Sequence, residues 1–314
     1  MSDDPLSDII ELVDARCAMT GGISASGPWA IAFPPPKAVK FIAILEGGCW
    51  LLMDILGAPL RLETGDVILL NTQHPFSLAS DPTVEPSGAV QIFANAADGF
   101  AKLGASQDFL MLGGHIALDE TRGHLLLDVL PPLIHVRGAA REAAAVQQLL
   151  AELLREVRSD RAGAKLAATM LAQLMFVQVL RAHLATSAEM SLGWLRALGD
   201  ERIAPAIRLL HGNPAKAWML GELAKAVAMS RTTFAARFKA VVGVAPLGYL
   251  LNLRMSLAAR DLRDRDDSVS AIGLALGYTS ESAFSNAFKR TMGIAPKRYR
   301  ATSRNEVRAA VGRG

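Results

Sequence analysis

The chain has 314 residues, of which 51% are hydrophobic and 20% charged, so it holds enough apolar side chains for two cores and is not a disordered protein. The net charge of +3 conceals an uneven distribution: residues 1–187 carry 13 Lys/Arg and 20 Asp/Glu, a net −7, whereas residues 188–314 carry 20 and 10, a net +10. A polyanion should be repelled by the first part and attracted by the second.

The N-terminus and the longest apolar run bear on the compartment. The opening residues, MSDDPLSDII, carry acids where a secretory signal needs a basic start. The longest nearly apolar run, 166–180, has 15 residues interrupted by Gln173 and Gln178, and a bilayer-spanning helix needs about 20. We expect a cytoplasmic protein with no membrane partner. Cys17 and Cys49 are the only cysteines and lack Cys-x-x-Cys spacing, so we expect them to pack rather than to form a disulfide or a zinc site.

Short β-rich runs separated by turn signals fill the region from Trp29 to about Ala94. Many short strands at near-regular spacing predict a small barrel or sandwich. A further strand is expected at 109–112, and 125–136 predicts a short helix with an extended exit after Pro131-Pro132. The predicted strands of the first region are 39–45, 49–56, 59–63, 66–70, 75–79 and 89–94.

The next region, from Ala140 to about Ala185, is rich in Ala, Leu, Gln and Glu with apolar residues at helical spacing. It predicts two helices broken near 159–163. Their apolar faces are wide for a connector, so the helices either cover the barrel or pair with a second copy of the chain. A homodimer is the expected assembly.

A repeat at an offset of fifty residues is the most specific signal in the sequence. Setting Ser230-RTTFAARFKAVVGVAPLGY beside Ser280-ESAFSNAFKRTMGIAPKRY aligns twenty residues without a gap, eight of them identical. The identical pairs are Ser230/Ser280, Phe234/Phe284, Phe238/Phe288, Lys239/Lys289, Gly243/Gly293, Ala245/Ala295, Pro246/Pro296 and Tyr249/Tyr299.

Each copy of the repeat predicts a capped helix with one buried and one free face. The Ser suits an N-cap, the two Phe residues share one face, and the Gly suits a helix end with positive φ. A short apolar helix precedes each copy, at 219–228 and 268–277, and a long helix, 246–264, joins the two units. This is the helix-turn-helix arrangement, whose second helix enters the DNA major groove, in duplicate on a rigid spacer. A helical bundle without DNA binding is the alternative interpretation.

In residues 200–301, most specifically in LALGYTSESAFSNAFKRTMGIAPKRYR, the sequence resembles the AraC/XylS family of transcription regulators. The N-terminal part, with WAIAFPPP, FIAILEGGCWLL and LETGDVILL, looks like the cupin-type sensing domain of one branch of that family. The resemblance implies an α+β protein with an N-terminal cupin-like β-barrel (1–139), a helical connector (140–198), and an all-α DNA-binding domain with two helix-turn-helix units (199–301). Residues 302–314 are expected to form a disordered basic tail.

The resemblance implies double-stranded DNA as partner, RNA polymerase as a further contact, and DNA-contacting positions on the two recognition helices. Asn286 is the best direct reader because Asn can bond bidentately to adenine, whereas Ala235 and Ala236 can only touch a thymine methyl. Glu281 is expected to stay in solvent. The base-contacting candidates are Arg231, Thr232, Ala235, Ala236, Glu281, Ser282, Ala283, Ser285 and Asn286, and the phosphate-contacting candidates are Lys239, Lys289, Arg290, Lys297, Arg298 and Arg300.

The first domain is expected to sense rather than to catalyse. The six histidines include no His-x-His pair, so the cupin metal set is absent, and no metal, cofactor or enzymatic activity is expected. A small-molecule effector could lie in an apolar barrel interior; a cupin-like enzyme and an effector-independent architectural protein, favoured by a filled interior, are the alternatives. The candidate pocket residues are Trp29, Phe33, Phe41, Trp50, His74 and Phe76.

Overall fold

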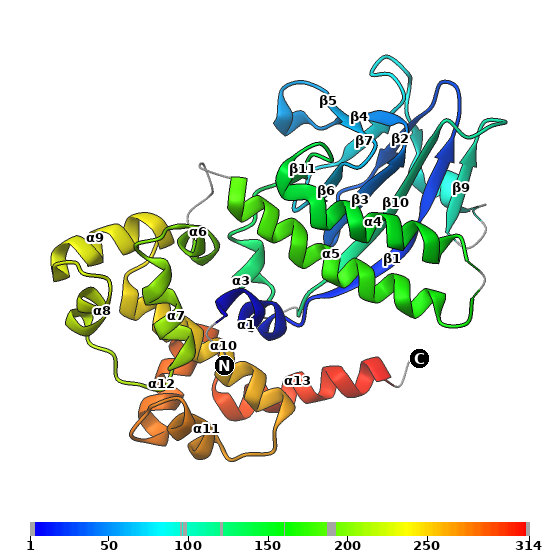
Figure 1. The fold of residues 1–314 in the computed structure, drawn as a ribbon. Helices are drawn as coiled ribbons and strands as arrows, with labels where there is room; N and C mark the ends of the chain where they lie inside the picture. Colours follow the sequence, from blue (N-terminus) through cyan, green and yellow to red (C-terminus); the bar gives the residue numbers. More distant parts are fainter. Residues whose placement is uncertain are drawn as a thin grey trace. The chain divides into compact units, whose positions relative to one another are not determined.

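The computed structural model describes residues 4–94, 96, 99–119, 122–159, 161–186 and 193–311 (Figure 1). The chain forms two compact units. The sheet unit consists of Asp14–Gly123 and Leu130–Ser191, and the helical unit of Met1–Val13, His124–Val129 and Leu192–Gly314. The helices after residue 140, expected to be a separate connector, thus belong to the sheet unit. The first thirteen residues belong to the helical unit.

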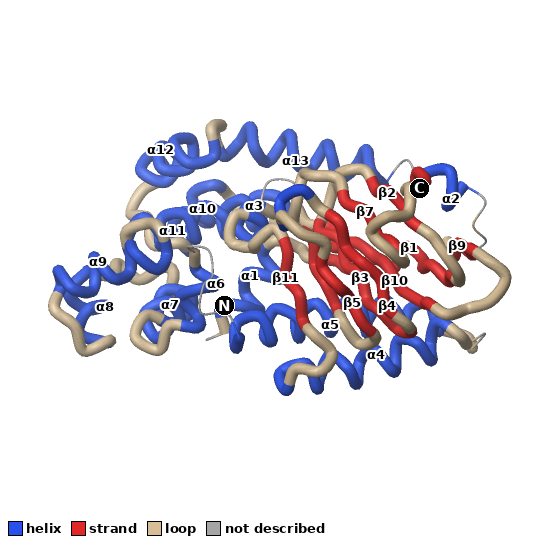
Figure 2. The backbone as a smooth tube through the Cα atoms, turned by 90° about the horizontal axis from the view of Figure 1, so that it is seen from above, coloured by secondary structure: helices blue, strands red, loops and turns tan. Residues whose placement is uncertain are grey.

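Two mixed sheets face each other in the sheet unit (Figure 2). The six-stranded sheet has the order β11-β6-β3-β10-β1-β9, and the five-stranded sheet has the order β5-β4-β7-β2-β8. Most neighbours are antiparallel, but β1 pairs β9 and β2 pairs β8 in parallel. The strands are β1 Arg16–Ala25, β2 Ala30–Phe33, β3 Val39–Glu46, β4 Gly48–Leu52, β5 Leu60–Glu63, β6 Val67–Leu70, β7 Phe76–Ala79, β8 Ser87–Gly88, β9 Phe100–Leu103, β10 Phe109–Ala117 and β11 Leu133–Val136.

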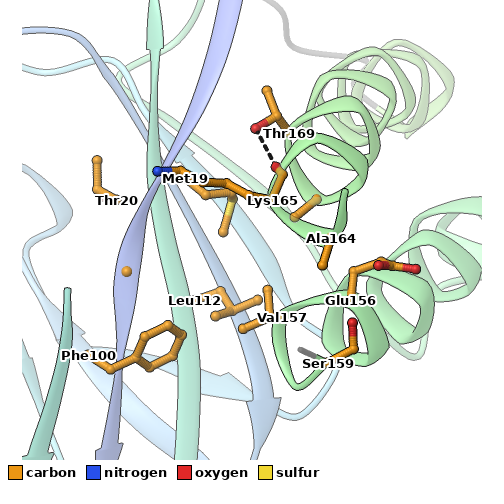
Figure 3. A pocket seen from close by; sticks show the side chains of 12 residues that line it. Met19, Thr20, Phe100, Leu112, Glu156, Val157, Ser159, Ala164, Lys165 and Thr169 are labelled. Carbon is orange, nitrogen blue, oxygen red and sulfur yellow. Dashed lines mark hydrogen bonds between the residues drawn. The ribbon is translucent and has the colours of Figure 1, made fainter. Parts of the chain in front are cut away.

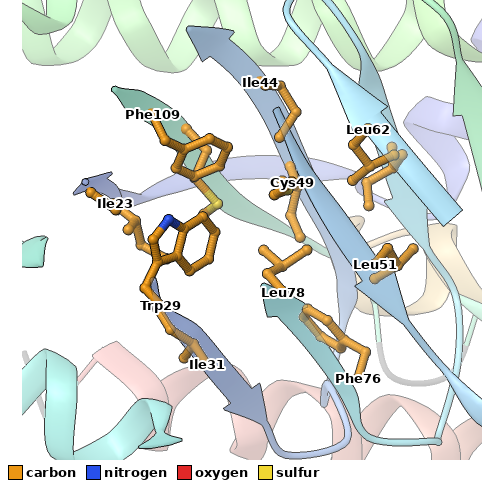
Figure 4. Close-up of a cluster of buried hydrophobic side chains, with 14 of the residues drawn as sticks. Ile23, Trp29, Ile31, Ile44, Cys49, Leu51, Leu62, Phe76, Leu78 and Phe109 are labelled. Atoms are coloured by element: carbon orange, nitrogen blue, oxygen red, sulfur yellow. The ribbon is translucent and has the colours of Figure 1, made fainter. Parts of the chain in front are cut away.

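The core of the sheet unit lies between the two sheets (Figure 4). Because side chains alternate along a strand, every second residue points inward. On β3 these are Ile42 and Ile44, and on β4 they are Cys49 and Leu51. The Trp29 ring packs against the Phe109 ring with centroids 4.7 Å apart. Close-packed apolar and aromatic side chains thus fill the middle of this space.

The segment 89–94, predicted to be a strand, is instead the helix α2, Ala89–Ala94. Ala89 is part of the core, and Ile92 and Phe93 pack against it. These positions follow the i, i+3, i+4 spacing of a helix, whereas a strand would have put Ile92 and Phe93 on opposite faces. The β-rich composition of AVQIFA was therefore a weaker guide than its periodicity.

Helices α4, Ala144–Val157, and α5, Ala164–Thr186, pack against each other and cover the six-stranded sheet through β1, β3 and β11. The side chain of Gln173 ties α5 to the start of β1, since its amide accepts from the Cys17 N–H and donates to the Ala15 carbonyl oxygen, both at 2.9 Å. By length and composition alone, Ala164–Ala185 could cross a membrane. Its contacts with α4, β1 and β11 place it on the six-stranded sheet.

The helical unit is built from short helices around the long α10. Its first three elements are α1 Pro5–Leu12, α3 His124–Leu127 and α6 Trp194–Gly199. The expected spacer helix at 246–264 is confirmed as α10, Pro246–Asp264, and most of its side chains are buried. The others are α7 Ala204–Gly212, α8 Leu220–Ala226, α9 Arg231–Val242, α11 Val269–Ala275, α12 Glu281–Met292 and α13 Pro296–Val311.

The N-terminal helix α1 is held in the helical unit by a buried polar cluster. His211 is fully buried, and its Nε2 lies 2.7 Å from the Tyr249 hydroxyl on α10. Its Nδ1 lies 3.4 Å from Oδ2 of Asp8 on α1. Burial and the nearby Asp8 carboxylate raise the pKa of the Tyr249 hydroxyl, so the phenol stays neutral. The chain's first helix is thereby part of the core around α7 and α10.

The residues after Ala301 differ from the expected disordered tail. Helix α13 continues to Val311, and only 312–314 of that segment lie outside the described residues. The run from Ala301 to Val311 contains neither Gly nor Pro, and Ala and Arg are good helix formers. The basic composition of this segment was therefore not a sign of disorder.

Candidate nucleic-acid interface and ligand cavities

The first helix pair, α8 and α9, has the geometry of a helix-turn-helix unit. The Ser230 hydroxyl caps α9 by accepting from the Thr233 N–H at 3.2 Å. Phe234 and Phe238 are fully buried, with ring centroids 5.6 Å apart. Gly243 ends the helix with φ +87°. The predicted roles of the cap, the aromatic face and the terminal glycine are confirmed for this unit.

The second pair, α11 and α12, reproduces the first. The Ser280 hydroxyl accepts from the Ala283 N–H at 3.2 Å, and Gly293 ends α12 with φ +79°. Phe284 and Phe288 are fully buried, with ring centroids 5.8 Å apart. Pro246 and Pro296 each open the next helix, and Tyr249 and Tyr299 pack edge-on against Phe238 and Phe288. These contacts account for six of the eight repeated identities.

The repeated pair Lys239 and Lys289 has no such structural account. Both side chains are exposed, and neither makes an ion pair or side-chain hydrogen bond within the described part of the chain. An exposed side chain with no ion pair or side-chain hydrogen bond to the described residues is available to a ligand. A cation near the end of each recognition helix suits a phosphate group.

The polar faces of α9 and α12 carry the candidate base-contacting residues. Ala235 and Ser285 are half-buried and the other seven are exposed. The Arg231 side chain lies over α8, since a Cβ placed on Gly221 would be 2.8 Å from its Nε. The Glu281 carboxylate, expected in solvent, is exposed and lies 3.9 Å from the Lys297 ammonium. That exposed pair contributes little to stability. The exposed side-chain amide of Asn286 on α12 forms no hydrogen bond with the described residues.

Five of the six candidate phosphate contacts are exposed: Lys239, Lys289, Arg290, Lys297 and Arg298. The sixth, Arg300, is half-buried, and its Nη2 donates to the main-chain carbonyl oxygen of Asp267 just before α11. Arg300 therefore holds the second helix pair in place instead of facing solvent. The Arg-rich sequence around it gave no sign of this difference.

A clamp centred on Arg254 joins the two helix pairs, and sequence reasoning did not find it. From α10, Arg254 Nε donates to the Pro214 carbonyl oxygen at 2.6 Å, and Nη2 donates to those of Ala215 and Lys216 at 3.2 and 2.8 Å. Its guanidinium carbon also lies 5.8 Å from the centroid of the Tyr278 ring, in the turn before α12. An arginine within a largely buried helix is the one sign of this clamp in the sequence. Its partners are main-chain carbonyl oxygens, which every residue has, so no residue type marks them.

The six candidate effector residues do not gather around one pocket. Trp29 and Phe76 are buried in the core, and Phe33 stacks on Phe76 at its edge, with centroids 4.8 Å apart. Phe41 and Trp50 point away from the space between the sheets, because their neighbours on each strand occupy the inward positions. His74 is exposed on a loop. The expected pocket in the middle of the sheets is filled by side chains.

Two of the cavities in the sheet unit border the middle of β1. One of about 560 Å³ separates β1 and β10 from α4 and α5, and Figure 3 shows Met19, Leu112 and Val157 on its walls with Glu156 and Lys165 on the helices. The other, of about 370 Å³, is lined by residues of α2 and of β1, β3 and β10. Thr20 and Gly21, beside an irregularity in the pairing of β1 with β10, border both cavities.

Thiols and metal-type clusters add no further site. Burial raises the pKa of Cys17 and of Cys49 to about 12, so both thiols stay protonated and unreactive at neutral pH. Among the described residues, no three His, Cys, Asp or Glu side chains are grouped so that they could hold a metal ion.

Comparison with known proteins agrees with both parts of the chain. A family model described as cupin matches residues 4–185, and one described as a helix-turn-helix domain matches residues 223–302. Over 297 residues, the chain is 40% identical to a putative AraC-like transcription regulator of Streptomyces lividans and 41% identical to one of Streptomyces antibioticus. Each alignment covers 95% of this chain and 98% of the relative. A solved AraC-type regulator from Chromobacterium violaceum is 29% identical over 34% of this chain and 96% of its own, with a TM-score of 0.33.

Proposed function

The chain belongs to the family of AraC-like transcription regulators, and from this premise we propose that α9 and α12 enter the major groove of double-stranded DNA. The observation that carries the proposal is the repeated pair Lys239 and Lys289, which are exposed beside two polar helix faces and form no ion pair with the described residues. A helix of 19 residues spans about 28 Å, and sites on one face of the duplex lie about 34 Å apart, so the length of α10 suits a spacer between two recognition helices on one face of the duplex.

Base edges and phosphates are assigned to different side chains. The bases are met by the exposed faces of α9 and α12, with Asn286 as the principal reader of adenine. The phosphates are met by Lys239, Lys289, Arg290, Lys297 and Arg298, which fix the register without reading sequence. Arg300 is left out of the phosphate set because it is engaged with Asp267.

Binding of the full chain to DNA upstream of its own gene, against scrambled DNA of equal length, tests this function. Each phosphate neutralised lowers log K by about 0.9 per unit of log salt concentration, so five contacts predict a slope of about −4 to −5 for both DNAs. The genuine sequence should bind more tightly at every salt concentration. Absence of binding at low salt would overturn the function, and equal binding to both would remove sequence reading from it.

Asn286→Ala should relax base preference at a single base pair. Loss of a bidentate amide contact costs about 1 to 3 kcal/mol at the position read, while phosphate contacts are untouched. Binding to a library of operator variants measures the effect position by position. Asn252→Ala, which removes an exposed amide from α10, is the matched control and should change nothing. An equal loss of affinity on all sequences would contradict base reading by Asn286.

We further propose that a small molecule bound in the sheet unit controls DNA binding, with RNA polymerase as the other macromolecular partner in the cytoplasm. Effector control is a linkage between two sites, so saturating effector must change DNA affinity, and DNA must change effector affinity by the same factor. The cupin match and the cavities around β1 support a sensing role. Enzymatic turnover would favour the cupin-like enzyme instead, and the relatives named as regulators argue against it.

The surface of α5 supports association of two copies. Leu166, Met170 and Leu174 follow one face at a spacing of four residues, with 66, 57 and 46% of each side chain exposed. Such a stripe is self-complementary when a twofold axis places two copies of the helix side by side. We assign its occupant as the second copy of this chain.

Met170→Glu should separate the proposed dimer. A twofold axis brings the new carboxylate into the interface twice, and burying an unpaired charge is costly, so the dissociation constant should rise on the order of 100-fold. Sedimentation velocity over a concentration series measures it. Met170→Leu keeps the apolar surface and should behave like the natural chain. A monomeric natural chain at micromolar concentration would show that α5 is not the dimer surface.

A further inference from the structure

The cavity of about 370 Å³ near α2 has apolar walls and one charged side chain. Its apolar lining includes Phe33, Ile42, Phe93 and Met111, and four glycines of β1, β10 and the segment before β9 contribute backbone only. The charged group is Lys40, near the start of β3. A concave apolar site with a few polar groups, here the Lys40 ammonium and the Thr20 hydroxyl, is the usual form of a small-molecule pocket.

Lys40 is directed into this space by the pleat of β3. Alternate residues of a strand share one face, so Lys40 lies on the same face of β3 as Ile42 and Ile44, which point between the sheets. Its partners on the neighbouring strands are Leu70 and His115. Its side chain lies across Gly113, because a Cβ placed on that glycine would be 4.0 Å from Lys40 Cε. A larger residue at 113 would occupy the room that the cavity provides.

The Lys40 ammonium has no counter-ion among the described residues. It forms no ion pair or side-chain hydrogen bond with them, although it is half-buried. Burial lowers the pKa of this ammonium, which means that its charged form is poorly solvated where it lies. An anion entering the cavity would restore the lost solvation through a charge-assisted hydrogen bond.

We propose that this cavity is the effector site and that Lys40 binds the carboxylate of an apolar monocarboxylic acid. The inference rests on the proposed effector control and adds the site and the ligand class. The single cation selects a single negative charge, and the aromatic and aliphatic walls take the uncharged remainder of the molecule. An amine of the same shape is repelled, and an alcohol lacks the charge.

A ligand in this cavity would contact β1, the strand that also lies beneath α5 on the outer face of the sheet. Thr20 and Gly21 form part of its wall and also border the cavity beneath α4 and α5 (Figure 3). Their strand has an irregular pairing with β10 between Met19 and Gly21, which interrupts the regular ladder at the segment that the two cavities share. A ligand that presses on this segment shifts the strand on which α5 rests.

Calorimetric titration of the full chain with octanoate, 1-octanol and octylamine tests the proposal, because these probes share one tail and differ in the head group. Octanoate should bind at least about 10-fold more tightly than the other two, as a hydrogen bond to a charged group contributes about 1.5 to 3 kcal/mol. Lys40→Met should weaken octanoate at least about 10-fold and leave octanol within about 2-fold, while Lys40→Arg retains octanoate binding. Lys37→Met removes an exposed lysine that does not line the cavity and should have no effect.

Equal octanoate affinity in the natural chain and Lys40→Met would overturn the proposal, as would octanol binding as tightly as octanoate or no octanoate binding. Measuring DNA affinity with and without octanoate separates this inference from the proposed function. Octanoate binding that depends on Lys40 upholds the site even where DNA affinity is unchanged, and that unchanged affinity then counts against effector control. Loss of DNA binding under all conditions would instead reject the regulator function.

Discussion

Gly277→Ala is expected to lower DNA affinity on the order of 100-fold and to destabilise the helical unit by about 2 to 4 kcal/mol. Gly277 ends α11 with φ +85°, and the N–H groups of Gly277 and Tyr278 bond back to Leu274 and Gly273. A Cβ here would lie 2.0 Å from the Ala215 carbonyl oxygen. The left-handed backbone is strained for alanine, and the collision adds a separate cost.

The collision matters because it falls on the contact between the two helix pairs. Ala215 belongs to the loop before α8, and the Arg254 clamp holds that loop from α10. Moving the Ala215 carbonyl oxygen away from the added methyl group breaks its hydrogen bond to Arg254. We therefore expect the two helix pairs, which must contact the duplex together, to move apart. Binding to an operator fragment and chemical unfolding of the full chain measure the two effects.

Gly293→Ala is the matched control for this substitution. Gly293 has φ +79° at the end of α12, but a Cβ there meets nothing within 4 Å. It should suffer only the strain of the left-handed backbone, about 1 kcal/mol, and keep most of its DNA affinity. Equal effects of the two substitutions would show that the Gly277 contact does not set the spacing of the recognition helices.

Trp29→Ala should destabilise the sheet unit by about 3 to 5 kcal/mol, as expected when a buried aromatic side chain is truncated in a packed core. Trp29 is 6% exposed and packs against Phe109 among the inward side chains of both sheets. Truncating a tryptophan that borders an open ligand pocket would lower the free energy of unfolding far less, because fewer of its contacts are with other protein side chains. Denaturation followed by circular dichroism, with amide exchange in β2 and β10, measures the change.

Trp50→Ala is the same chemical change at a tryptophan of β4 that points away from the space between the sheets. Trp50 is half-buried, and its ring centroid lies 5.5 Å from the Arg61 guanidinium carbon. An exposed cation–π contact of this kind contributes about 0.5 to 1 kcal/mol, so Trp50→Ala should lower the free energy of unfolding by about 1 kcal/mol. If Trp29→Ala proved as mild as Trp50→Ala, the space between the sheets would be a cavity after all.

The helical unit was predictable because its signals are local. Ser230, Gly243 and Pro246 mark helix ends by their own backbone chemistry, and the repetition at Ser280, Gly293 and Pro296 removed the ambiguity of a single match. The structure has both helix pairs, and the helix-turn-helix family model matches the segment that holds them.

The sheet unit was predictable in class and less so in detail. The strands at 39–45, 66–70 and 75–79 are confirmed to within one or two residues. The strand β1 escaped prediction because Gly21-Gly22 reads as a turn, yet these glycines let Gly99 and Phe100 approach where side chains would collide. The direction of Phe41 and Trp50 depended on strand register, which composition does not encode.

The site residues divide in the same way. The exposure of Asn286 and of Lys239 follows from helix periodicity once the buried face is known. The engagement of Arg300 with a main-chain oxygen, the Arg254 clamp and the isolation of Lys40 are tertiary facts. Each depends on a partner, or the lack of one, far away in the sequence, and no local pattern marks it.

Helix α1 and the Asp8–His211–Tyr249 cluster limit how this protein can be recombined with its relatives. A chimera that exchanges only the C-terminal residues from 192 onward would set a foreign α7 and α10 against the original α1 and α3. His211 would then meet an unmatched residue 8, and the indole N–H of Trp194, which donates to the Leu125 carbonyl oxygen at 2.7 Å, would have to find its acceptor in a foreign loop. The exchangeable DNA-binding module is therefore discontinuous, and a functional graft must carry residues 1–13 and 124–129 with it.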